Sequence, residues 1–364
     1  MLMVKSTLKV FLVFSLLISA VLAKNVSTAI SSLAKNTDLR TDVSIYSFNA
    51  DSSQVYTLKG GMRLGLILES NKSDDFYYYG KMNIFFEEGS FRSLNDDSFA
   101  SANTYGVEEA FFKWSPSTYF YAKAGVSKVE REDHSLFINP PALGLKLNTR
   151  PFDFNFLEVD TFATINTISN NSTQSRTGKI DGKASYYLLL GVDIRMLSDM
   201  IDFKLHYKGF SFNKLTSEYA FKSRFRGSSV TGTGELSSRF TKDYSGHHVS
   251  SKVKMKGLYL KPSLRAELIS NSDADDQGHL MGLGLESDHF KYKIERFEND
   301  PNTLPAAIVS PYYGGTNREG FVTGITYLNK NYQINVDYYT MTTIAASPYQ
   351  DDLDIIFIEF SRGL

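Results

Sequence analysis

The feature of this sequence that most constrains its fold is a repeated alternation of apolar and polar residues. From Leu58 to Glu69, every second residue is apolar or glycine, and the residues between them include Lys59 and Arg63. Successive side chains point to opposite faces of a β-strand, so this pattern indicates a strand with one apolar face. The same alternation occurs at 186–195, 201–208, 290–295 and 332–339. Because sustained helical periodicity is absent, the sequence predicts an all-β protein.

The alternation predicts sixteen strands along the chain. They are 42–50, 56–69, 75–87, 104–114, 118–129, 142–148, 153–166, 184–196, 201–212, 250–260, 263–270, 278–286, 290–298, 320–328, 332–342 and 353–361. One alternative topology remains open. Residues 219–225 could form an extra strand with a partner in 234–244, which would give eighteen strands.

The connections between these strands fall into two classes that alternate along the chain. Odd-numbered connections are 5 to 37 residues long, and the longest is 213–249, whereas even-numbered connections are 2 to 5 residues long. A soluble sandwich has no reason to collect its long loops at one end. Outer-membrane barrels have short periplasmic turns, long external loops and an even number of strands. The pattern therefore favours a transmembrane antiparallel β-barrel.

A bilayer also explains why one face of each strand is nearly free of charge. Strands in lipid must close into a barrel, because an open edge would leave backbone groups unpaired. In such a barrel the apolar face contacts lipid and the polar face lines the lumen. We therefore expect the following charged side chains to point inward: Lys59, Arg63, Glu69, Lys81, Asp193, Arg195, Lys204, Lys208, Lys293 and Asp337.

The first 23 residues predict export. Lys5 and Lys9 flank a short n-region, an apolar run follows at 10–21, and residues 21–23 fit a signal-peptide cleavage site. The run is too short to cross a bilayer as a helix. Residues 24–364 are then expected to form a single barrel domain in the outer membrane of a Gram-negative bacterium.

Composition excludes several other functions. The chain has no Cys, which excludes thiol catalysis and zinc–thiolate sites. Its formal net charge of −1 gives no reason to expect nucleic acid as a partner. Nothing in the sequence indicates a cofactor or a metal site.

One hairpin resembles a hairpin of Gram-negative general porins. Residues 106–116 form an acidic-Ala-aromatic strand, Glu109-Ala110-Phe111, and residues 119–126 end in a Gly-containing step at Gly125. The resemblance implies a sixteen-stranded homotrimer that contacts outer-membrane lipid and lipopolysaccharide and is inserted by the barrel-assembly machinery. The chain departs from the pattern at its end, where residues 361–364 follow Phe360 instead of a terminal aromatic.

The resemblance also implies where the channel is narrowed. In porins the third external loop, here 130–141, folds into the lumen opposite basic residues on the early strands. The constriction-loop candidates are Glu130, Arg131, Glu132, Asp133 and His134. The pore-wall candidates are Arg63, Lys81, Lys113, Lys123, Glu69 and Glu109.

The favoured function is passive diffusion of small hydrophilic solutes and ions through a water-filled barrel narrowed by the inserted loop, since about 16–18 strands leave an aqueous channel. Two alternatives remain open. Inward-facing aromatics, namely Tyr77, Tyr79, Phe85 and Phe111, could line a solute-specific channel. The loop 213–249 could instead serve adhesion or display, with the barrel as its anchor.

An outer-membrane hydrolase is the least favoured function. The chain contains no Gly-x-Ser-x-Gly or His-Glu-x-x-His motif, and its six His are scattered. The adjacent pairs Glu87-Glu88 and Glu108-Glu109 are expected to point to opposite faces of their strands, so neither would act as a carboxylate pair.

Overall fold

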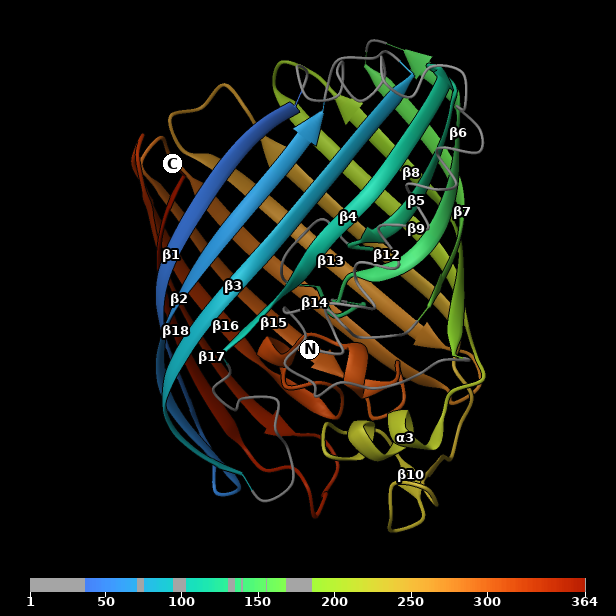
Figure 1. Ribbon diagram of the computed structural model, residues 1–364, viewed down its shortest axis with the longest axis vertical. Helices are drawn as coiled ribbons and strands as arrows, with labels where there is room; N and C mark the ends of the chain where they lie inside the picture. Colours follow the sequence, from blue (N-terminus) through green and yellow to red (C-terminus); the bar gives the residue numbers. More distant parts are fainter. Residues whose placement is uncertain are drawn as a thin grey trace.

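The computed structural model describes residues 37–70, 75–93, 103–129, 135–138, 140–154, 156–167 and 185–363. Sixteen tilted strands form one closed antiparallel barrel (Figure 1). Each strand pairs with its neighbour in the chain, with β9 followed by β12, and β18 closes the ring on β1 from Asp42↔Gly363 to Asp51↔Asp354. The predicted sixteen-stranded barrel is therefore confirmed.

Each predicted strand corresponds to one barrel strand. The barrel strands are β1 (Thr37–Asp51), β2 (Val55–Ser70), β3 (Phe76–Ser93), β4 (Thr104–Ser117), β5 (Phe120–Ser127), β6 (Ala142–Phe154), β7 (Leu157–Thr167), β8 (Tyr186–Leu197), β9 (Ile201–Asn213), β12 (Ser245–Met255), β13 (Lys261–Asn271), β14 (Asp276–Glu286), β15 (Phe290–Asn299), β16 (Arg318–Leu328), β17 (Gln333–Thr343) and β18 (Leu353–Gly363).

The loop asymmetry is also confirmed. Connections at one end, called the turn end here, are two to five residues long, whereas those at the other, the loop end, are 3 to 31 residues long. The boundaries differ most at three strands: β12 spans 245–255 instead of 250–260, and β3 and β6 each end six residues later than predicted. Residues Lys261 and Pro262, which the predicted strand boundaries leave as the turn before the next strand, instead begin β13. Proline is tolerated at this position because it lies where a strand starts.

The eighteen-strand alternative is wrong. Residues Ser217–Arg224 form the helix α3, and β10 (Val230–Thr231) pairs only with β11 (Arg239–Phe240). The buried residues of α3 are Tyr219, Ala220, Ser223 and Arg224, which share one helical face. Among the described residues, no helix is long and apolar enough to cross a bilayer.

The two faces of the strands have the predicted orientation. In β15, Tyr292 and Ile294 are 48% and 54% exposed on the outer face, whereas Glu295 and Phe297 are buried on the inner face. The outer surface thus presents apolar side chains around the barrel, as lipid contact requires.

The polar character expected of the inner face does not extend to the loop end. There the inner face is apolar, and it packs against loops that fold back into the barrel. The wall residues of this packed core include Phe210, Phe212, Ile269, Leu280, Phe297, Val322 and Ile355. Inserted loops exclude water from this part of the lumen, so an apolar wall is favoured there.

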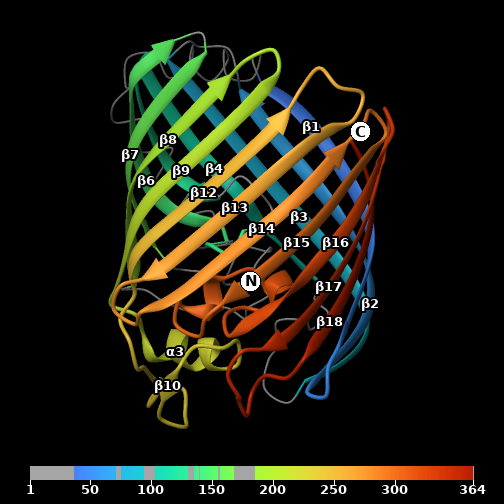
Figure 2. The same cartoon turned by 180° about the vertical axis from the view of Figure 1, so that it is seen from behind.

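Two of these loops hold each other in place inside the loop end. Loop 300–317, with its short helices η1 (Ala306–Ile308) and η2 (Pro311–Tyr313), lies inside the barrel beside α3 (Figure 2). Buried Arg226 donates hydrogen bonds to the carbonyls of Ala307 (3.2 Å) and Val309 (3.0 Å). The N–H of Ala307 in turn donates to Ser223 Oγ (3.1 Å). We call these two loops, 214–244 and 300–317, the cap.

Candidate functional site

The six pore-wall candidates all lie on inner-face positions of β2 to β5, although their role in a pore stays a prediction. Arg63 Nη2 lies 3.1 Å from Glu359 Oε1. Lys81 Nζ lies 3.2 Å from Glu108 Oε2 and 3.5 Å from Asp42 Oδ2. Glu69 accepts a hydrogen bond from Tyr77 OH at 2.9 Å. Each of these charges is therefore held by neighbours on the same wall.

A β-bulge in β4 changes the prediction for Glu108 and Glu109. Lys81 pairs with Glu109 and Met82 pairs with Val107, so Glu108 is an extra residue. Glu108 contacts Lys128 Nζ (3.2 Å), and Glu109 accepts from the Lys128 N–H (2.7 Å). The prediction that they face opposite sides is wrong, because the bulge brings both carboxylates to the inner face. Glu87 and Glu88 do face opposite sides.

Lys113 and Lys123 belong to a row that the sequence did not reveal in full. Lys113 pairs with Lys123, and Lys123 pairs with Lys146 of β6. Each ammonium lies over an inward-facing ring, at 4.4 Å from Tyr121, 4.6 Å from Phe111 and 4.1 Å from Phe162, respectively. Like charges opposite each other are destabilising, and each cation–π contact offsets this by about 0.5–1 kcal/mol.

Three of the four predicted lumen aromatics form one cluster. The Phe111 ring lies 5.5 Å from that of Tyr79, in a stacked arrangement, and 6.0 Å from that of Tyr77. Phe85 lies further along the same face of β3, where it pairs with Arg63. The partly exposed rings of Tyr77, Tyr79 and Phe111 could therefore contact a solute in the lumen.

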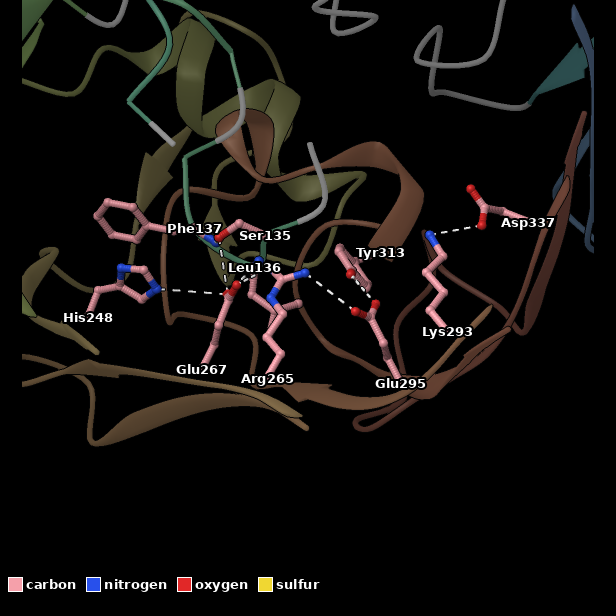
Figure 3. Close-up of polar contacts among 10 residues, drawn as sticks. All are labelled: Ser135, Leu136, Phe137, His248, Arg265, Glu267, Lys293, Glu295, Tyr313 and Asp337. Atoms are coloured by element: carbon pink, nitrogen blue, oxygen red, sulfur yellow. Dashed lines mark hydrogen bonds and ion pairs between the residues drawn. The ribbon is translucent and has the colours of Figure 1, made fainter. Parts of the chain in front are cut away.

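The constriction-loop candidates, Glu130, Arg131, Glu132, Asp133 and His134, lie outside the described residues. The described segment that follows them, Ser135–Ile138, is buried against the inner wall (Figure 3). Ser135 Oγ and the Leu136 N–H both donate to Glu267 Oε2 at 3.1 Å. The Phe137 ring stacks on His248 with 4.4 Å between centroids.

Glu267 belongs to a network of polar side chains on β12, β13 and β15 that holds two loops (Figure 3). His248 Nε2 lies 3.8 Å from Glu267, and Arg265 forms an ion pair with the same carboxylate. Arg265 also lies 3.4 Å from Glu295, which accepts a hydrogen bond from Tyr313 OH at 2.9 Å. Glu267 therefore holds loop 128–141, Glu295 holds loop 300–317, and Arg265 connects them.

The sequence analysis did not identify His248, Arg265, Glu267 or Glu295 as candidates. The available signal was their position, because charged residues in the interior of a strand with an apolar opposite face must point into the lumen. The sequence could not reveal the partners of these side chains, since Glu267 and Ser135 are 132 positions apart. The described residues contain no group of three His, Asp or Glu that could hold a metal ion.

Comparison with solved structures identifies the same fold in two outer-membrane porins. OprB of Pseudomonas putida, in a structure at high pH, matches with a TM-score of 0.59 and 10% identity over 93% of this chain and 96% of OprB. OmpF of Salmonella typhi, in complex with daunomycin, matches with a TM-score of 0.51 and 12% identity over 90% of this chain and 97% of OmpF. No family model matches the chain, and a search of curated proteins finds no match.

At these identities the likeness concerns the fold alone. The chain forms a closed sixteen-stranded barrel of the outer-membrane type, similar in fold to these porins. The predicted fold class and type of barrel are therefore confirmed.

Proposed function

We propose that the protein is an outer-membrane diffusion channel for small hydrophilic solutes and ions. A barrel of about 16–18 strands is wide enough for an aqueous passage. Charged inner-wall side chains keep contact with solvent, including Arg63 (24% exposed) and Lys293 (26% exposed). A lumen filled throughout by apolar packing would not leave these charges hydrated.

The observation that carries this proposal is the course of loop 128–141. The loop connects β5 to β6, yet Ser135–Phe137 contacts β12 and β13, which follow only after β7, β8 and β9 in the barrel. The described segment Ser135–Phe137 therefore lies inside the barrel, away from the two strands that the loop connects. It supports a constriction partway along the passage, whose width and charge would set what permeates.

The remaining expectations complete the proposal. The signal peptide at 1–23 lies outside the described residues, and we retain it as the route of export. We also retain the homotrimer, the lipopolysaccharide contact and insertion by the assembly machinery. Permeation requires no catalytic group, so the proposal assigns the protein no enzymatic activity.

Planar-bilayer recording of the purified, detergent-solubilised protein tests the proposal. An open pore with an ohmic current is expected, together with heat-modifiable migration and a resistant oligomer band on gels. A barrel that migrates as folded but carries no current would contradict the proposal. That result would favour a surface protein that displays its cap.

A second candidate, a solute-specific channel, is favoured by the cluster of Tyr77, Tyr79 and Phe111. Aromatic faces stack on the apolar faces of solutes, and the nearby Glu69 and Lys113 offer polar contacts. Solute-dependent block of the current distinguishes this candidate from a general channel.

A further inference from the structure

A second row of cations crosses the inner wall, on strands that the sequence analysis did not single out together. Arg195 of β8 pairs with Lys204 of β9, Lys204 pairs with Lys252 of β12, and Lys252 pairs with Arg265 of β13. All four side chains lie on the inner face. Neighbouring strands are about 4.7–4.9 Å apart, so four positive charges follow one another at close spacing.

This row is unfavourable for the fold taken alone. Like charges directly opposite on paired strands are destabilising. At the ends of the row, Arg195 lies 3.6 Å from Asp202, and Arg265 contacts two carboxylates, Glu267 and Glu295, which offset its charge. Lys204, near the middle, makes no ion pair with any of the described residues. Lys204 therefore contributes a positive charge that no described carboxylate offsets.

Cations on β15 to β18 and on β1 to β3 are arranged differently. Lys59 lies 3.1 Å from Glu87, Lys293 lies 2.8 Å from Asp337, and Arg63 lies 3.1 Å from Glu359. On β15 to β18 and β1 to β3, positive and negative side chains thus neutralise each other locally. The arc from β8 to β13 instead presents a net positive surface to the lumen.

We propose that Arg195, Lys204 and Lys252 form a binding row for small oxyanions and make the channel prefer anions. Ammonium and guanidinium groups donate charge-assisted hydrogen bonds to phosphate and carboxylate oxygens. Because neighbouring strands are only about 4.7–4.9 Å apart, one oxyanion can be contacted by two adjacent cations of the row. This inference rests on the proposed channel function and names the class of solute that the channel favours.

The reversal potential in a KCl gradient tests the row, with the full chain in planar bilayers. The wild type is expected to prefer chloride over potassium. Lys204→Gln is expected to lower the chloride-to-potassium permeability ratio severalfold. The matched control is Lys254→Gln, which removes the same charge from the same face but from a residue 2.9 Å from Glu286. This control is expected to change the ratio much less.

Inorganic phosphate provides a second readout. Phosphate added on one side should reduce the chloride current of the wild type in a concentration-dependent way. The reduction should weaken in Lys204→Gln and persist in Lys204→Arg, which keeps the charge. A wild type that prefers potassium, or equal effects of Lys204→Gln and Lys254→Gln, would overturn the inference while leaving the channel intact. Absence of any current in the folded wild type would overturn the proposed function itself.

Discussion

Glu267 of β13 accepts hydrogen bonds from both the hydroxyl of Ser135 and the backbone N–H of Leu136. A single buried carboxylate on the wall thus holds a loop that starts at β5, six strands away around the barrel. Because Arg265 connects Glu267 to Glu295 and so to Tyr313, loop 128–141 and loop 300–317 share one electrostatic support. Side chains on β12 to β15 therefore hold both of these loops inside the barrel.

Replacing this carboxylate should release the loop. Glu267→Ala removes the acceptor of two hydrogen bonds and a partner of Arg265, and each buried group left unsatisfied costs about 1–3 kcal/mol. We expect faster tryptic cleavage within 128–141 and a larger, noisier single-channel current. Glu359→Gln is the control, since Glu359 contacts Arg63 on the same inner face and not the loop. Unchanged cleavage in Glu267→Ala would contradict the role of this anchor.

The cap should depend on the guanidinium of Arg226. Arg226→Lys keeps the positive charge but replaces the planar fork that reaches the carbonyls of Ala307 and Val309 with a single ammonium. We expect proteolytic cleavage in 214–244 and 300–317 to accelerate. Heat-modifiable migration should not change, because the barrel ladders do not involve these contacts. Loss of the folded band would show instead that the cap is required for the barrel.

Gly125 should be essential for the β4–β5 pairing. Its φ of +130° is unfavourable for other residues, and a Cβ atom there would lie 2.2 Å from the Ala110 carbonyl oxygen. Gly125→Ala is therefore expected to lower the yield of heat-modifiable barrel strongly. Gly80→Ala is the control, since its Cβ would meet only ordinary contacts at 3.9 Å. Similar yields for both variants would refute the steric argument.

The solute-specific alternative makes its own prediction for the aromatic cluster. Phe111 touches both Tyr77 and Tyr79, so Phe111→Ala should abolish any block of the current by a sugar. Phe85→Ala removes a ring from the same face of the wall but outside the cluster. If a sugar blocks the wild type and both variants equally, the cluster is not a binding site.

Much of the fold could be predicted because each strand contacts lipid on one face and the lumen on the other. This imposes a local alternation of apolar and polar residues that the sequence shows directly. Even the bulge is visible in the sequence. The outward-facing apolar residues fall on odd-numbered positions up to Val107 and on even-numbered positions from Ala110 onward. The helix α3 was missed because its residues also fit a short alternation. The loop contacts were missed because Ser135 and Glu267 meet only after the barrel has closed.

Tyr313 should make the cap sensitive to alkaline pH. Burial, followed by the nearby charge of Glu295, raises the pKa of Tyr313 well above its usual value of 10.0. The folded protein therefore favours the neutral phenol, and its stabilising effect is complete below about pH 10 and declines as pH rises above that value. We expect proteolysis of 300–317 to accelerate above pH 10 in the wild type. Tyr313→Phe lacks the hydrogen bond to Glu295, so its cap should be weaker at pH 8 and less dependent on alkaline pH. An equal alkaline increase in both proteins would assign the sensitivity to other groups.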